Sequence, residues 1–122
     1  MTLDAGALIA FERGDQRIRA LVQEARATGA SLGVPAAVLA QVWRDGARQA
    51  RLAALVGSRT VEIVALDVTA AKAVGRLCGL TGTADVVDAS VVLAAQVRSD
   101  RVVTSDPADL AAIDPGLELL VV

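Results

Sequence analysis

The sequence Thr83-Ala84-Asp85-Val86-Val87-Asp88-Ala89 opens the most apolar helical segment of the chain, which continues through residues 90–97. Asp85 and Asp88 are three residues apart, so both carboxylates lie on one face of the first helical turn. Thr83 or Asp85 can cap the helix, because a helix N-terminus favours negative charge. Capping explains one carboxylate well, but two on the same face repel each other unless a cation lies between them. The stretch therefore indicates either a helix cap or part of a metal site.

Short apolar segments alternate with helical ones on both sides of this stretch. Strands are predicted at residues 2–4, 31–34, 61–65, 101–104 and 117–121. Helices are predicted at residues 5–12, 15–29, 35–44, 47–55, 69–80 and 107–113, in addition to the one that begins near Thr83. Strands that alternate with helices predict a three-layer α/β fold, in which helices flank a mainly parallel central sheet. The length of 122 residues favours a single domain, residues 1–122.

The composition narrows the class of protein further. Hydrophobic residues make up 54% of the chain, but no run approaches the roughly eighteen uninterrupted apolar residues that a membrane span needs. No basic segment precedes Leu3, so we expect no signal peptide. Cys78 is the only cysteine, which excludes an internal disulfide and fits a reducing cytoplasm.

The charged residues limit the possible chemistry. The chain has no histidine, which excludes histidine-based triads and the common zinc sites. A metal must then be held by oxygen ligands, which favours magnesium, manganese or calcium. The net charge of −2 gives no overall attraction to nucleic acid.

Further acids follow the predicted strands. Asp4 ends the first strand, and Asp106 follows the strand 101–104. In a parallel sheet both positions lie at the edge where ligands bind, beyond the carboxyl ends of the strands. The helix that carries Asp88 can begin at the same edge. We therefore expect a carboxylate cluster there.

Each acid also suits a helix cap. Asp4 can cap the helix 5–12, and Asp106 with Asp109 fits an Asp-Pro helix start. The residues by themselves leave three possibilities open: a carboxylate metal site, caps alone in a non-nuclease binding domain, or a phospho-acceptor pocket like that of a receiver domain. The only lysine, Lys72, lies in the middle of a predicted helix, which disfavours the receiver alternative.

Four blocks of the sequence, in this order and spacing, resemble the PIN domain and in particular the VapC-type toxins of bacterial toxin–antitoxin systems. The blocks are residues 4–10, 35–44, 85–89 and 103–106, and the resemblance covers essentially the whole chain. It implies a single PIN-like domain that acts as a magnesium- or manganese-dependent endoribonuclease. It also implies a homodimer and a cognate antitoxin protein as partners, and single-stranded or looped RNA as the substrate.

The resemblance further implies roles for individual residues. The catalytic acids would be Asp4, Asp88 and Asp106, and Asp85 would join them as a metal ligand. Assisting roles would fall to Gln41, Ser105 and Asp109.

Two residues depart from the family pattern. Gln41 stands where PIN domains usually carry an acid, and Ala5 stands where a hydroxyl residue is common. An amide oxygen can coordinate a metal but brings no charge. The alternative function is therefore a degenerate PIN domain that binds RNA or a protein partner without cleaving.

Basic residues follow Gln41 at helical spacing, provided that the helix continues through Gly46. Arg44, Arg48 and Arg51 would then form one stripe, either contacting RNA or the antitoxin or lying on an ordinary solvated face.

Overall fold

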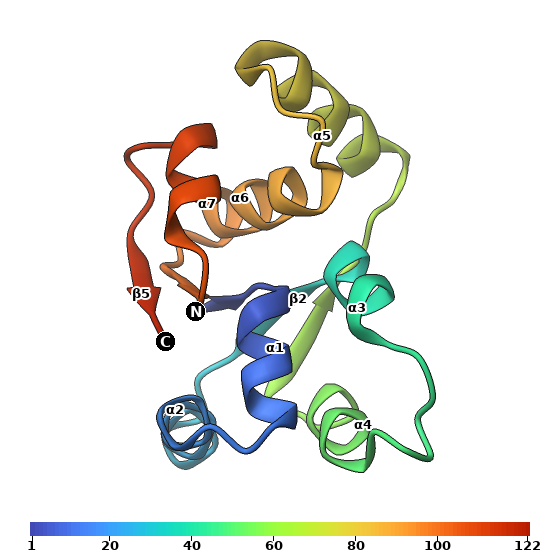
Figure 1. Ribbon diagram of the computed structural model, residues 1–122, viewed down its shortest axis with the longest axis vertical. Helices are drawn as coiled ribbons and strands as arrows, with labels where there is room; N and C mark the ends of the chain where they lie inside the picture. Colours follow the sequence, from blue (N-terminus) through green and yellow to red (C-terminus); the bar gives the residue numbers. More distant parts are fainter.

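The computed structural model describes all 122 residues and is built on a sheet of five parallel strands in the order β3-β2-β1-β4-β5 (Figure 1). The strands are β1 (Thr2–Leu3), β2 (Leu32–Pro35), β3 (Val61–Val64), β4 (Val102–Thr104) and β5 (Leu119–Val121). The predicted strands are all confirmed, with ends shifted by one or two residues. The sheet is entirely parallel, and the architecture is consistent with the predicted three-layer PIN-like α/β fold.

Seven helices surround the sheet: α1 (Ala5–Glu12), α2 (Gln16–Thr28), α3 (Ala36–Val42), α4 (Ala50–Val56), α5 (Val68–Thr81), α6 (Val86–Arg98) and α7 (Pro107–Ile113). On one side of the sheet, α2 and α4 pack against α1 (Figure 1). On the other side, α5 and α7 pack against α6. Helix α3 contacts both α1 and α6, so it closes the carboxyl edge of the sheet between the two helical layers.

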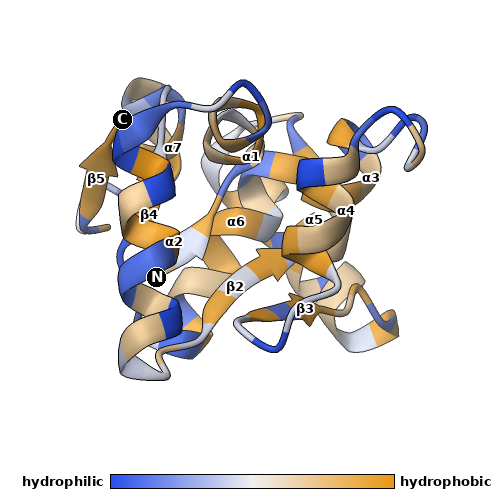
Figure 2. Cartoon of the chain, turned by 90° about the horizontal axis from the view of Figure 1, so that it is seen from below, coloured by the Kyte–Doolittle hydropathy of each residue, from blue (hydrophilic) through white to orange (hydrophobic).

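The shortest strand lies at the centre of the molecule. Thr2 and Leu3 of β1 are fully buried, and β1 is hydrogen-bonded between β2 and β4. Helix α6 buries the middle of its length, residues 89–92, 94 and 95, which explains the Ala and Val content of this part of the helix. One core of 19 buried residues contains residues of β1, β2 and β4 and of helices from both layers. Figure 2 shows the same distribution, with apolar residues concentrated on the strands and on the helix faces that cover them.

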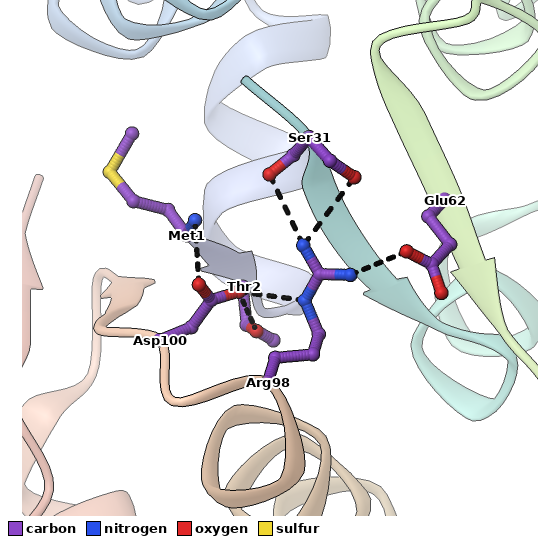
Figure 3. Close-up of polar contacts among 6 residues, drawn as sticks. All are labelled: Met1, Thr2, Ser31, Glu62, Arg98 and Asp100. Carbon is purple, nitrogen blue, oxygen red and sulfur yellow. Dashed lines mark hydrogen bonds and ion pairs between the residues drawn. The ribbon is translucent and has the colours of Figure 1, made fainter.

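A polar cluster ties the amino edge of the sheet together (Figure 3). The guanidinium of Arg98 donates to Asp100 and Glu62, each at 2.7 Å, and to the carbonyl of Ser31 at 3.2 Å. Asp100 also accepts from the Thr2 hydroxyl at 3.1 Å and pairs with the amine of Met1 at 3.3 Å. Burial acts to raise the pKa of Asp100, but Arg98 and this amine outweigh burial and lower it. The end of α6 is thereby fixed to strands β1, β2 and β3.

The connection between α3 and α4 differs from the prediction. Helix α3 ends at Val42 rather than near Arg44, because Trp43 adopts an extended conformation, and α4 begins only at Ala50. The side chain of Gln49 organises the turn between them. Its Oε1 accepts from the amides of Arg44 and Asp45, at 2.7 and 2.9 Å, and its Nε2 donates to the carbonyl of Val42 at 2.9 Å.

No single helix is both long and apolar enough to cross a membrane; α5 and α6 reach that length and composition only as a pair, which is bent by 109° at the break between them.

Candidate functional site

The strand order reverses direction between β1 and β4. From β1 the chain moves to β2 and β3 on one side, and it later returns to β4 and β5 on the other. In open parallel sheets, ligands bind at such a reversal of strand order, beyond the carboxyl ends of the strands. Asp4 follows β1 directly, and Asp106 comes two residues after β4. Both acids therefore lie at the carboxyl edge of the sheet, at this reversal of strand order.

Asp4 is the most buried acid of the group, with 7% of its surface exposed. It caps α1, and its Oδ1 accepts a hydrogen bond from the amide of Ala7 at 2.8 Å. Burial raises the pKa of Asp4, the negative charge of Asp106 adds to the increase, and hydrogen bonds from Thr104 and the α1 backbone oppose it. Asp4 is therefore both a cap and a member of a charged group.

Asp85 and Asp88 lie at the start of α6, at the same edge of the sheet. This helix leads into β4, so its N-terminus reaches the carboxyl edge of the sheet. Asp85 caps α6, and its Oδ1 accepts from the amides of Val87 and Asp88, each at 3.0 Å. Burial, then Asp85, and then Asp109 and Asp4 raise the pKa of Asp88 to about 6. Asp88 is thus near enough to Asp4, which precedes α1, and to Asp109 of α7 for their charges to affect its pKa.

Asp106 and Asp109 stand at the start of α7. The amide of Asp106 donates to Thr104 Oγ1 at 2.9 Å, while its carboxylate makes no capping hydrogen bond. A hydrogen bond with Asp106 and the negative charge of Asp106 raise the pKa of Asp109, which is fully exposed to solvent. The predicted Asp-Pro start of α7 is confirmed, but Asp106 does not act as its side-chain cap.

Three of these acids line one hollow of about 350 Å³: Asp85, Asp88 and Asp109. The rest of its lining comes from the end of α5, the loop that follows and the end of α7, and it contains no basic side chain. No three acidic side chains converge closely enough, in the conformation described, to ligate one ion together. The negative charges of the carboxylates in this hollow therefore repel one another, and no cationic side chain that lines the hollow offsets the repulsion.

Capping accounts for only part of this group. Asp4 and Asp85 accept capping hydrogen bonds, whereas Asp88 and Asp106 make none. Caps alone therefore leave two of the four predicted metal ligands unexplained.

The assisting residues differ in their positions. Ser105 is exposed beside Asp106 and lies directly over Gly6, where any Cβ would collide with its side chain. Gln41 is exposed in the last turn of α3 and makes no hydrogen bond to the acids. Thr104 is the residue that the sequence analysis missed, since its buried hydroxyl opposes the pKa shift of Asp4 and accepts from the Asp106 amide. Its place in the block 103–106 is the only signal that could have identified it.

The predicted basic stripe is wrong, because α3 and α4 are separate helices. Arg44 folds back onto the carbonyls of Trp43 and Ala40. Arg48 pairs with Asp45 at 3.7 Å. Arg51 lies on α4 and donates to the carbonyl of Glu12 at 3.3 Å. These three arginines therefore do not share a helix face.

Comparison of the sequence with protein-family models gives no matching family, and comparison with curated proteins gives no match. The chain is thus an α/β protein with a five-stranded parallel sheet in the order 3-2-1-4-5, flanked by helices, and with acids at its topological switch point.

Proposed function

We propose that this chain is a metal-dependent endoribonuclease of the PIN type that hydrolyses RNA phosphodiester bonds. The observation that carries the proposal is the environment of Asp88: burial and the nearby acids Asp85, Asp109 and Asp4 raise its pKa to about 6, and the hollow that it lines with Asp85 and Asp109 contains no basic residue. A protein keeps such repulsion at a ligand-binding edge when a cation relieves it on binding. The four sequence blocks that resemble VapC-type toxins are the second support.

The residues present fit a divalent cation with oxygen ligands. Magnesium usually binds through one or two carboxylates, keeps several water ligands, and takes the rest from substrate phosphates. A site of this kind does not need three convergent side chains, and the separated carboxylates observed here suit it. Asp88 and Asp106 are free of capping hydrogen bonds and would hold the ion, with Asp4 and Asp85 beside them.

A bound divalent cation would activate a water molecule for attack and would stabilise the negative charge that builds up on the scissile phosphate. The residues of the chain position the reactants. Asp4 is fixed by its bond to the Ala7 amide, and Asp85 is fixed by the α6 amides.

The biological role follows from the resemblance alone. We propose a cytoplasmic toxin that acts as a homodimer and is neutralised by a cognate antitoxin.

Cleavage of a mixed RNA substrate in magnesium or manganese tests the proposed activity. Wild-type protein should cut RNA only with the metal, and the variants D4N, D88N and D106N should lose nearly all cleavage. The products should carry no 2′,3′-cyclic phosphate, because water rather than the ribose hydroxyl is the nucleophile. Cleavage that survives in D88N, or that leaves cyclic phosphate ends, would refute the proposal.

A second candidate function is supported by Gln41. This residue brings no charge where the family usually has an acid, and it is exposed at the end of α3 without a hydrogen bond to the acids. A degenerate PIN domain would bind RNA or a protein partner without cleaving. Metal-independent binding with no cleavage in any divalent cation would favour this alternative.

A further inference from the structure

A hollow of about 240 Å³ lies beside the C-terminal half of α1, between α2 and α4. Three arginines line it: Arg19 and Arg26 from α2 and Arg51 from α4. Arg19 and Arg26 are seven residues apart, so they lie on the same face of α2. Figure 1 shows α2 and α4 on either side of the lower end of α1. The sequence analysis identified Arg51 but grouped it with the wrong partners.

The positive charge in this hollow is not neutralised within the protein. None of its three guanidinium groups pairs with a carboxylate, whereas Arg98 at the amino edge pairs with two. Arg51 is held only by the carbonyl of Glu12, at 3.3 Å. Three like charges around one hollow, in a chain with net charge −2, create a local site for an anion.

A second hollow, of about 620 Å³, lies along α1. Ser105, next to Asp106, lines one end of it, and Arg13, Gly14 and the carboxylate-bearing Asp15 line the other. Nη1 of Arg51 lies 3.0 Å from the position that a Cβ would take on Gly14, so the two hollows meet at this residue. The eight residues of α1 span about 12 Å, which several nucleotides of a single strand can cover.

We propose that the arginine hollow binds backbone phosphates of an RNA strand that runs along α1 away from the acid group. The identity of the polyanion rests on the proposed nuclease function. Guanidinium groups hold phosphates through paired N–H donors. An acidic peptide would also meet the arginines, but the path toward Asp106 offers it little apolar anchorage, since Ile9 and Ala10 are the only hydrophobic residues that line it.

The test compares the double variant R19Q/R26Q with a matched control, K72Q/R76Q. Both variants remove two exposed positive charges from a single helix, and the control charges lie on α5, at the opposite end of the molecule (Figure 1). Arg51 is left in place because it braces the turn after α1. The measurement is fluorescence anisotropy of a labelled single-stranded RNA of about 16 nucleotides, in EDTA, over a range of salt concentrations.

We expect R19Q/R26Q to bind RNA about tenfold more weakly than wild type at low salt. The slope of the logarithm of the association constant against the logarithm of the salt concentration should become less negative by roughly 1 to 2. The RNA affinity of the control variant should stay within about twofold of that of wild type, because salt screens charges that lie far from the bound RNA. Equal losses in both variants, or no loss in R19Q/R26Q, would overturn the inference. Unchanged RNA binding with lost binding of a polyglutamate peptide would assign the hollow to a protein ligand and overturn it as well.

The outcome separates this inference from the proposed activity. If wild-type protein cleaves RNA but R19Q/R26Q binds it normally, the arginine hollow is excluded and the nuclease stands. If wild-type protein binds RNA through these arginines but cuts nothing in magnesium or manganese, the binding site stands and the nuclease fails.

Discussion

The carboxylate of Asp85 accepts a hydrogen bond from the amide of Asp88 at 3.0 Å, and the charge of Asp85 also raises the pKa of the Asp88 side chain. One residue thus caps α6 and repels its neighbour. Capping and mutual repulsion are therefore not alternatives here, because the carboxylate that caps α6 also disfavours the charged form of Asp88.

The first prediction concerns the pH dependence of stability without metal. The pKa of Asp88 is about 6 when folded and about 4 when unfolded. Below pH 4 both states hold the proton, so Asp88 has no effect on the free energy of unfolding. From pH 4 to 6 the folded state binds more protons, so the contribution of Asp88 lowers stability as pH rises.

D88N removes this penalty. At pH 7 in EDTA we expect the variant to exceed wild type by about 1 to 2 kcal/mol in urea unfolding, after a reduction for solvent screening. The difference should vanish near pH 4. A D88N variant that is less stable than wild type at pH 7 would show that Asp88 has a stabilising role instead.

The second prediction separates the two roles of Asp4. D4N keeps an acceptor for the Ala7 amide and removes the buried charge, so its stability in EDTA should equal or exceed that of wild type. D4A removes the acceptor from a buried position and should lose about 1 to 3 kcal/mol. Thermal unfolding of the two variants makes the comparison. Equal destabilisation by both would mean that the charge itself stabilises the fold.

A third prediction concerns the amino edge. R98A leaves Asp100 and Glu62 without their shared partner and should cost about 2 to 3 kcal/mol in urea unfolding. R101A breaks an exposed pair with Glu118 and should cost less than about 1 kcal/mol. RNA cleavage by folded R98A should be unaffected, since the cluster lies at the opposite edge of the sheet. Similar losses in both variants would contradict the importance assigned to the partly buried cluster around Arg98.

The fourth prediction tests the contact between Gly6 and Ser105. A Cβ at residue 6 collides with the Ser105 side chain, so G6A should cost roughly 1 kcal/mol or more. The double variant G6A/S105G removes the obstacle and should recover much of this loss. Differential scanning calorimetry of the four proteins of this cycle gives the coupling energy directly. Additive effects would indicate that the two residues do not touch in solution.

Local patterns predicted most of the fold. Helices α1 and α7 match their predicted bounds, because a cap or an Asp-Pro start marks where each begins. Gly29 ends α2 in the left-handed conformation that its position predicts. The error between α3 and α4 arose from a contact that no local rule contains: Gln49 folds back on residues 42–45 and holds Trp43 in an extended conformation.

The sequence predicted which acids belong to the candidate site, but it did not predict how they are arranged in space. The acids at strand ends follow from sequence spacing and the rule for parallel sheets. Whether α6 brings Asp88 to Asp4 depends on the strand order, which places β4 next to β1. The arginine hollow depends on the packing of α2 and α4 around α1, and for this reason Arg19 and Arg26 could not be grouped with Arg51 in advance.

The most direct test of the central claim is the thermal unfolding of wild type and D88N at pH 7 during a titration with magnesium, repeated with manganese. The account predicts that metal raises the Tm of wild type by several degrees in a saturable manner, because binding to the folded state alone stabilises it, and that it has little effect on D88N. It predicts, too, that the order of stability of the two proteins reverses as metal is added. No shift in wild type, or an equal shift in both proteins, would contradict a cation site at these carboxylates.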